Sequence, residues 1–191
     1  MFALKSPRTR RERDMRKDIR IGGAGGQGVI MLSVLLANAY GIHLGMEAVQ
    51  TQSYGPAARG GSCKAEVVVS DAPIDYVKAD DVDVLVAFNQ VSFQKYSQDV
   101  KKDTLIFVDS TLLTPEDTIG FSNVMAIPAT DYAEKHFAPV VANIIMFGFM
   151  TAKMESLTLE AAQKALKDTL PGKALDMNMK ALEFGYRKGM E

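Results

Sequence analysis

A glycine-rich segment near the start of the chain has the chemistry of an anion site. Residues 22–28 read GGAGGQG and lie between a short apolar alternation, 19–21, and an apolar run, 29–32. This order predicts a strand, a tight turn and the start of a helix, where glycines allow close backbone approach and free N–H groups carry partial positive charge. The alternative is a purely structural turn that lets the strand and the helix pack closely. The residues expected to contact an anion are Gly23, Gly25, Gly26, Gln27 and Gly28.

A second glycine-rich segment, residues 53–61, follows some two dozen residues later. It places an aromatic ring, Tyr54, and a fork of five donors, Arg59, on a turn stiffened by Pro56. Such a loop suits a carboxylate, a phosphate or an acidic partner surface, whereas the simpler reading of Arg59 is an exposed arginine on a surface turn. We predict that the two loops form one site. Its residues from the second loop are Ser53, Tyr54, Gly55, Arg59, Gly60 and Gly61.

The first loop matches the pattern G-x-G-x-x-G, which is typical of dinucleotide sites when it follows a strand and precedes a helix. Such sites also need an acidic residue at the end of the second strand to hold the ribose. Here that strand is expected to end in Gln50-Thr51-Gln52. The sequence therefore disfavours a nicotinamide cofactor.

No catalytic set or metal site is predicted elsewhere. His43 and His136 lack metal-ligand spacing and are interpreted as packing or surface residues. Cys63 is expected to be a small buried residue of a strand, with Lys64 pointing the opposite way. The acidic cluster at residues 80–83 lacks the pattern of a calcium loop and is interpreted as a solvated turn.

The remaining sequence predicts an α/β fold: one three-layer domain with a central mixed, largely parallel sheet flanked by helices. Met146, Met150 and Met154 would share one helical face, either in the core or as an adaptable surface for a partner. The expected strands are 19–21, 47–52, 63–70, 83–88, 104–109 and 124–127, with 74–77 as a possible hairpin partner of 63–70. The expected helices are 29–40, 90–100, 131–136, 143–154, 158–170 and 173–188.

Composition places the chain among single-domain cytoplasmic proteins. It has 191 residues, 47% of them hydrophobic, one cysteine and a net charge of −1, and it shows neither a signal peptide nor an apolar run long enough for a membrane span. Residues 1–15 form a basic extension that we expect to be disordered, and residues 16–191 the domain. The extension lacks the interleaved aromatics of a nucleic-acid arm, so neither nucleic acid nor a membrane is expected as a partner.

Both loops, in this order and at this separation, resemble the gamma subunit of 2-oxoacid:ferredoxin oxidoreductases. The resemblance extends through EVVVSD at 66–71 and PIDY at 73–76 and covers the chain from about Met15 onward. The PIDY segment is most similar to the 2-oxoglutarate branch, although the pyruvate, branched-chain and indolepyruvate enzymes share the domain. One departure is Ala57, at a position where the family often carries glutamate, so a contact made by that glutamate is not carried over.

The resemblance implies a complex that oxidatively decarboxylates a 2-oxoacid to an acyl-CoA and passes electrons to ferredoxin. It implies thiamine diphosphate, magnesium and iron–sulfur clusters on partner chains, namely thiamine-binding alpha and beta subunits and a ferredoxin-like delta subunit. A cluster needs about four thiolates, whereas this chain has one cysteine. The chain is therefore expected to be an accessory subunit with no catalytic residue and no cofactor of its own.

Three hypotheses for the subunit follow. In the first, it closes over the active site and helps present coenzyme A, with the first loop and Arg59 nearest the phosphates. In the second, both loops only dock partner subunits and the chain is a scaffold, which could self-associate when isolated. In the third, the chain is a stand-alone nucleotide-binding module.

Overall fold

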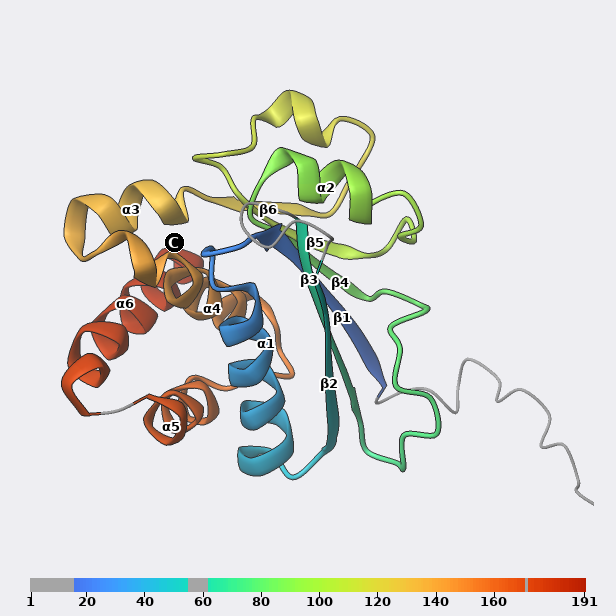
Figure 1. Ribbon diagram of the computed structural model, residues 1–191, viewed down its shortest axis with the longest axis horizontal. Coiled ribbons are helices and arrows are strands. Elements are labelled where there is room, and N and C mark those ends of the chain that lie inside the picture. Colours follow the sequence, from blue (N-terminus) through green and yellow to red (C-terminus); the bar gives the residue numbers. More distant parts are fainter. Residues whose placement is uncertain (1–15, 55–61, 171) are drawn as a thin grey trace, which may run out of the picture.

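The computed structural model describes residues 16–54, 62–170 and 172–191. Its centre is a six-stranded sheet in the order β2-β3-β1-β4-β5-β6. Strands β1, β4, β5 and β6 pair in parallel, whereas β3 is antiparallel to both β1 and β2. The predicted mixed, largely parallel sheet is therefore confirmed. Figure 1 shows the strands crossing the middle of the molecule between two groups of helices.

The elements alternate along the chain as the hydrophobic pattern predicted. The strands are β1 (Lys17–Ala24), β2 (Glu47–Tyr54), β3 (Ser62–Ser70), β4 (Val84–Ala87), β5 (Leu105–Asp109) and β6 (Val124–Ile127). The helices are α1 (Val29–Asn38), α2 (Gln90–Tyr96), α3 (Ala129–His136), α4 (Ala142–Lys153), α5 (Leu159–Thr169) and α6 (Gly172–Met190). Three short helical turns complete the fold: η2 (Ala39–His43), η3 (Pro115–Thr118) and η4 (Pro139–Val141).

The two faces of the sheet carry separate hydrophobic clusters. Helices α1, α3, α4, α5 and α6 contribute to the larger one, which also contains alternate residues of the central strands such as Ile19, Ile21 and Val67. The smaller cluster lies under α2 and contains Leu85, Phe93 and other residues. Because successive side chains of a strand point to opposite faces, β4 and β5 supply both clusters, whereas β1 presents the Arg20 side chain to the α2 face. This is the predicted three-layer arrangement.

Helices α4 and α6 pack at unusually close range. A Cβ at Gly148 would collide with the backbone oxygen of Leu182, and one at Gly185 with the backbone oxygen of Ile145. Glycine at these two positions removes the side chains that would otherwise hold the helix axes apart. Met146, Met150 and Met154 lie in the core beside this contact. Of the two interpretations of the methionine face, core packing is confirmed, and the partner surface was wrong.

The predicted hairpin between 63–70 and 74–77 does not form. Strand β3 pairs instead with β2 on one side and β1 on the other, and residues 71–83 contain no strand. The carbonyl oxygens of Tyr76 and Lys78 accept hydrogen bonds from the Arg16 guanidinium, and that of Ala79 accepts one from Arg20. Side-chain donors therefore occupy carbonyls that a hairpin ladder would have used.

Candidate functional site

Strand register places the ends of both glycine-rich segments at the same end of the strands, the carboxyl end of β1. Ala24, the last residue of β1, pairs with Ser62 at the start of β3, and Tyr54, the last residue of β2, pairs with Cys63. The carboxyl ends of β4, β5 and β6 lie at the same edge because these strands run parallel to β1. The chain also reverses its direction across the sheet between β1 and β4, which is where open α/β sheets bind ligands.

The first loop has the strand, turn and helix arrangement that the sequence predicted. Gly26 and Gly28 have φ angles of +95° and +75°, in the left-handed region that favours glycine. A Cβ at Gly26 would meet nothing within 4 Å, and Gly25 and Gly26 are exposed. Gly28 is the N-cap of α1, and no side chain of the described residues caps the first N–H groups of this helix, a position that favours anions. Gly23 is buried against Val29 and Phe88.

The side chain of Gln27 holds the loop in shape. Its Oε1 accepts hydrogen bonds from the Ala24 N–H at 2.7 Å and from the Asn89 amide at 2.7 Å, and its Nε2 donates to the Phe88 carbonyl at 3.3 Å. Asn89 in turn caps α2 by accepting from the Ser92 N–H. Gln27 therefore ties the end of β1 to the end of β4, and its polar atoms are used within the chain.

Asn143 fixes the other side of the loop. Its Nδ2 donates to the Gly28 carbonyl at 3.3 Å, and a Cβ on Gly28 would collide with it. The side chain is 4% exposed, and its Oδ1 has no hydrogen-bond partner among the described residues. The beginning of α4 thus meets the beginning of α1. Asn143 could not be identified from the sequence, because the contact spans 115 positions in the chain and no local pattern marks it.

The second loop is described only at its ends. Ser53 is an exposed residue of β2, and the backbone of Tyr54 completes that strand. The remaining predicted residues of this loop, Gly55, Arg59, Gly60 and Gly61, lie outside the described residues, so their roles stay predictions.

A buried ionic network lies below this edge on the α2 face of the sheet. The Arg20 guanidinium donates to Glu66 at 3.1 Å, to Asp99 at 2.7 Å and to the Ala79 carbonyl at 3.0 Å. Lys64 donates to the same Glu66 carboxylate at 2.9 Å. In the sequence, the signal for this pairing is a lone charge, Arg20, between two apolar residues of a strand, Ile19 and Ile21.

Beside this network, an open pocket of about 380 Å³ lies on the uncovered part of β2 and β3. It contains two ammonium groups and one carboxylate, together with hydroxyl and amide groups. Its lining residues are Thr51, Gln52, Ser53, Lys64, Glu66, Val77 and Lys78.

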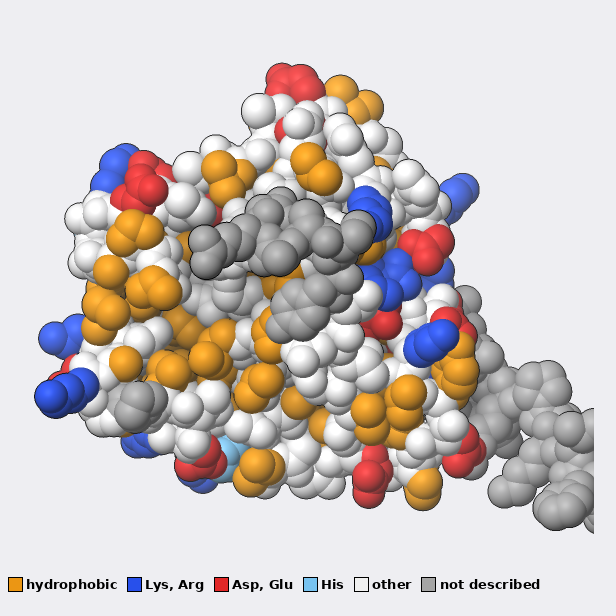
Figure 2. All heavy atoms as spheres, viewed as in Figure 1, with side chains coloured by type: hydrophobic (Ala, Val, Ile, Leu, Met, Phe, Trp, Pro, Cys, Tyr) orange, Lys and Arg blue, Asp and Glu red, His pale blue; other side chains and the backbone are white. Residues whose placement is uncertain are grey.

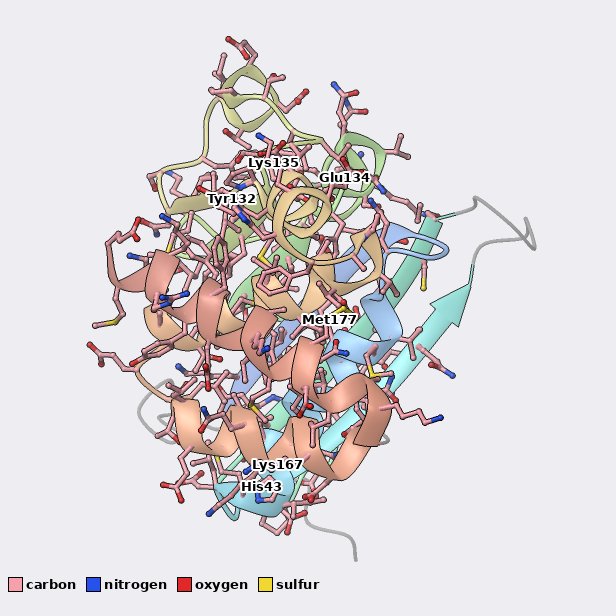
Figure 3. The ribbon with its side chains drawn as sticks, turned by 90° about the vertical axis from the view of Figure 1, so that its left-hand side faces the viewer. His43, Tyr132, Glu134, Lys135, Lys167 and Met177 are labelled. Atoms are coloured by element: carbon pink, nitrogen blue, oxygen red, sulfur yellow. The ribbon has the colours of Figure 1, made fainter. Side chains whose placement is uncertain are left out.

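The other residues considered for chemistry have structural surroundings. His43 bonds Asp168 at 2.8 Å, joining η2 to α5, where His43 and Lys167 are labelled together in Figure 3. His136 packs against the rings of Tyr132 and Phe184. Cys63 is buried, which raises the pKa of its thiol. These findings confirm the structural interpretations of both histidines and of the cysteine.

The acidic cluster at residues 80–83 is tied to the chain more closely than a solvated turn. The Asp83 carboxylate accepts from the Asp18 backbone N–H and from Lys101, and Asp81 also pairs with Lys101. Across the described ranges, no group of three or more histidine, cysteine or acidic residues could hold a metal ion. In the same ranges, no helix combines the length and the apolar character needed to cross a membrane.

Comparison with known proteins identifies the family. The chain matches the model of the pyruvate ferredoxin/flavodoxin oxidoreductase family over residues 18–188. It is 40% identical over 179 residues to 2-oxoglutarate synthase subunit KorC of Methanocaldococcus jannaschii, an alignment that covers 93% of this chain and 96% of the relative.

Solved structures agree with this assignment. The gamma subunit of a keto/oxoacid ferredoxin oxidoreductase from Geobacter sulfurreducens superposes with a TM-score of 0.80 at 38% identity, covering 92% of this chain and 97% of that one. The same fold occurs in 2-oxoglutarate:ferredoxin oxidoreductase from Magnetococcus marinus, with a TM-score of 0.80 at 20% identity. There the match covers 93% of this chain but 31% of the other. The chain therefore belongs to the pyruvate ferredoxin/flavodoxin oxidoreductase family, as a non-catalytic gamma-type subunit of a multi-subunit 2-oxoacid:ferredoxin oxidoreductase.

Proposed function

We propose that this subunit serves a 2-oxoglutarate oxidoreductase and that its first glycine loop receives a phosphate group of coenzyme A. The observation that carries the proposal is the loop itself: an exposed turn, Gly25-Gly26, leads into the uncapped N-terminus of α1 at the sheet's switch point. Such an arrangement favours anions through N–H donors and the helix dipole. A 2-oxoglutarate substrate is favoured by the KorC relatives.

Coenzyme A is supported as the anion by a protein of the same fold. The Magnetococcus marinus enzyme was solved with 2-oxoglutarate, coenzyme A and succinyl-CoA bound. The thiamine diphosphate, magnesium and iron–sulfur clusters would reside on partner chains of the alpha, beta and ferredoxin-like delta type, and the complex would work in the cytoplasm. The present chain would orient the coenzyme while a partner holds the acyl group. Arg59, predicted to lie near the same phosphates, is part of this proposal on sequence grounds alone.

A matched pair of substitutions at Gly25 tests the loop. Gly25 is exposed and is not among the glycines with a left-handed φ angle, so its backbone conformation does not oppose a side chain. In the assembled complex, Gly25→Asp places a carboxylate against the phosphate and should raise the KM for coenzyme A about fivefold, from roughly 1 kcal/mol of repulsion near 4 Å. Gly25→Asn, of nearly the same shape, should change that KM much less. The KM for 2-oxoglutarate should stay unchanged in both variants.

Equal coenzyme A KM values for Gly25→Asp, Gly25→Asn and the unmodified complex would contradict the proposal. With the complex still assembled, that result would favour the scaffold hypothesis, in which the loop serves docking alone. Arg59→Ala, measured by coenzyme A titration of the same complex, tests the second loop separately. An unchanged affinity would remove Arg59 from the proposed site.

A further inference from the structure

We propose that strand β2 pairs with the β2 strand of a second copy of this chain, so that two sheets join antiparallel across a two-fold axis centred on Gln50. This inference is independent of the coenzyme A proposal, since it concerns the edge of the sheet and not the loops at its end. Three observations carry it: the open edge of β2, the placement of Glu47 relative to the lysine pocket, and exposed apolar residues on both sides of the edge.

Within the described residues, no element covers the outer edge of β2. Strand β2 is eight residues long and is the outermost strand on its side of the sheet. Figure 3 shows it along the right-hand margin, with no helix or strand beyond it. Residues 48–53 read AVQTQS, without charge or proline. Natural edge strands usually carry lysine, proline, a bulge or a covering element against unwanted pairing. An edge that lacks these features indicates a partner strand.

Two-fold symmetry restricts the register of such a pair. The axis maps each facing pair onto an equivalent pair with the same side-chain direction, and because this direction alternates along a strand, one residue must lie opposite its own copy. With Gln50 at the axis, Val49 lies opposite Thr51 of the second copy, and Glu47 lies opposite Ser53. The one charged residue of the strand therefore never meets its own copy, which would have been destabilising.

Charge complementarity selects this register. Ser53 pairs with Lys64 on β3, and both residues line the 380 Å³ pocket together with Lys78. Residues that face each other across an antiparallel pair point to the same side, so Glu47 would point to the side of the second copy's pocket. Two strand spacings, roughly 10 Å between backbones, separate it from Lys64 there, a span within reach of the two side chains.

The pocket can accept this carboxylate. Its lining has two lysines and one acidic residue, Glu66, and that acid is already shared between Lys64 and Arg20. The Glu47 side chain is exposed, whereas its backbone belongs to the β2–β3 ladder opposite Ser70. The two-fold axis would form this contact twice.

Exposed apolar side chains flank the edge on both faces. On the helical face, η2 packs Gly41 against Ala48 of β2 and leaves the adjacent Ile42 65% exposed. On the open face, Val77 lines the pocket and is 43% exposed. A second sheet continuing from β2 would cover both, which adds apolar burial to the backbone hydrogen bonds of the strand pair.

Disulfide trapping tests the register directly. The only native cysteine, Cys63, is buried, so an introduced cysteine dominates oxidation. Gln50→Cys in the full chain should form a covalent dimer of twice 20.8 kDa under mild oxidation, because the residue faces its own copy. Thr51→Cys, which would face Val49, should crosslink poorly, and Lys173→Cys on an exposed turn of α6 reports random collision. The Gln50→Cys crosslink should also join two copies within the assembled complex.

Charge reversal tests the pocket contact. Glu47→Lys would place an ammonium against the two lysines in both halves, and the dimer dissociation constant from sedimentation equilibrium should rise roughly tenfold. The double variant Glu47→Lys with Lys78→Glu should recover most of the affinity. The proposal is overturned if the unmodified chain sediments as a monomer at all concentrations, if Gln50→Cys crosslinks no faster than Lys173→Cys, or if the double variant shows no recovery.

Discussion

The two faces of the sheet differ in what covers them. One face lies under a continuous helical layer whose members approach so closely that α4 and α6 meet through Gly148 and Gly185. The other is covered by α2 over β1 and β4, and beside it the pocket over β2 and β3 contains Lys64 and Glu66, which form an ionic network with Arg20 of β1 in place of an apolar core. Helices can thus be packed to backbone contact on one side of a sheet while charged groups satisfy one another on the other.

Because of this difference, we expect the helical face to contribute mainly to stability and the open face mainly to recognition. Interior packing on the helical face leaves no room for added atoms, whereas the open face and the carboxyl edge retain groups that can meet another molecule. Figure 2 shows that the helical side also presents hydrophobic side chains gathered over α6, α4 and α1. Half-buried residues of α1, such as Ile30 and Met31, pack against the larger cluster. Substitutions on the two faces should therefore differ in the size and kind of their effects.

The largest effect is expected at the α4–α6 contact. Gly148→Ala or Gly185→Ala would bring a methyl group against a backbone oxygen of the facing helix, which a rotamer change cannot relieve. We expect a loss of about 3 to 5 kcal/mol in the free energy of unfolding, measured by chemical denaturation. Gly172→Ala, where a Cβ would meet nothing within 4 Å, is the matched control and should change stability by less than about 1 kcal/mol. Equal effects at the two kinds of site would refute the close contact.

The buried network on the other face should give the next largest effect. Arg20 is 7% exposed and Glu66 5% exposed, so Arg20→Met leaves a buried carboxylate with Lys64 as its remaining partner. We expect a loss of about 3 kcal/mol in the free energy of unfolding. The double variant Arg20→Met with Glu66→Met should recover part of this loss because no buried charge remains. Strictly additive losses in this double-mutant cycle would show that the two side chains do not interact.

The hydrogen bonds of Gln27 in the first loop should contribute less to the free energy of unfolding than either buried region. Gln27→Ala removes the acceptor of the Ala24 N–H and of the Asn89 amide, and we expect it to cost about 1 to 2 kcal/mol. Gln27→Glu keeps both acceptor bonds but sets a carboxylate oxygen against the Phe88 carbonyl oxygen, so its effect measures the third bond of Gln27 separately. Native-state hydrogen exchange at the Ala24 amide measures how much the substitution weakens the loop locally. Unchanged protection in Gln27→Ala would contradict the role of Gln27 in holding the loop.

Local patterns were sufficient to predict most elements. Continuous apolar runs such as 104–109 gave buried parallel strands, and the glycine-rich segment 22–28 gave the strand, turn and helix start. The prediction for 74–77 was wrong because β3 already has β2 on one side and β1 on the other, and the Arg16 guanidinium takes the Tyr76 carbonyl oxygen. The local pattern of residue types does not show which distant residues will contact the segment in the folded chain.

In the candidate site, too, features set by local sequence could be predicted and features set by tertiary contacts could not. The exposed glycines of the first loop could be predicted because their conformational freedom and their position before a helix are local properties. Gln27 was predicted to contact a ligand, and the structure shows its polar atoms engaged with Ala24, Phe88 and Asn89. Asn143 was missed, and the Arg20–Glu66 pair joins residues 46 positions apart. Roles set by tertiary contacts require the fold.

The smallest effect concerns the pH dependence contributed by Asp18, at the border of the open face. Burial raises the pKa of its carboxyl above the ordinary 3.8, although a hydrogen bond from Arg16 at 2.8 Å opposes the shift. The folded state therefore binds this proton more tightly than the unfolded state. The corresponding stability is fully present below pH 3.8 and is lost as pH rises through the folded-state pKa.

Comparison of the unmodified chain with Asp18→Asn across the acidic range isolates this contribution. The stability of the unmodified chain relative to Asp18→Asn should fall as pH rises from 3.8 and then level off, as measured by urea denaturation at each pH. Arg16→Met removes the opposing interaction and should extend the fall to higher pH. A rise in relative stability over the same range would mean that the Arg16 ion pair outweighs burial. The carboxylate would then stabilise the edge of the open face, and its polar groups would contribute to folding as well as to recognition.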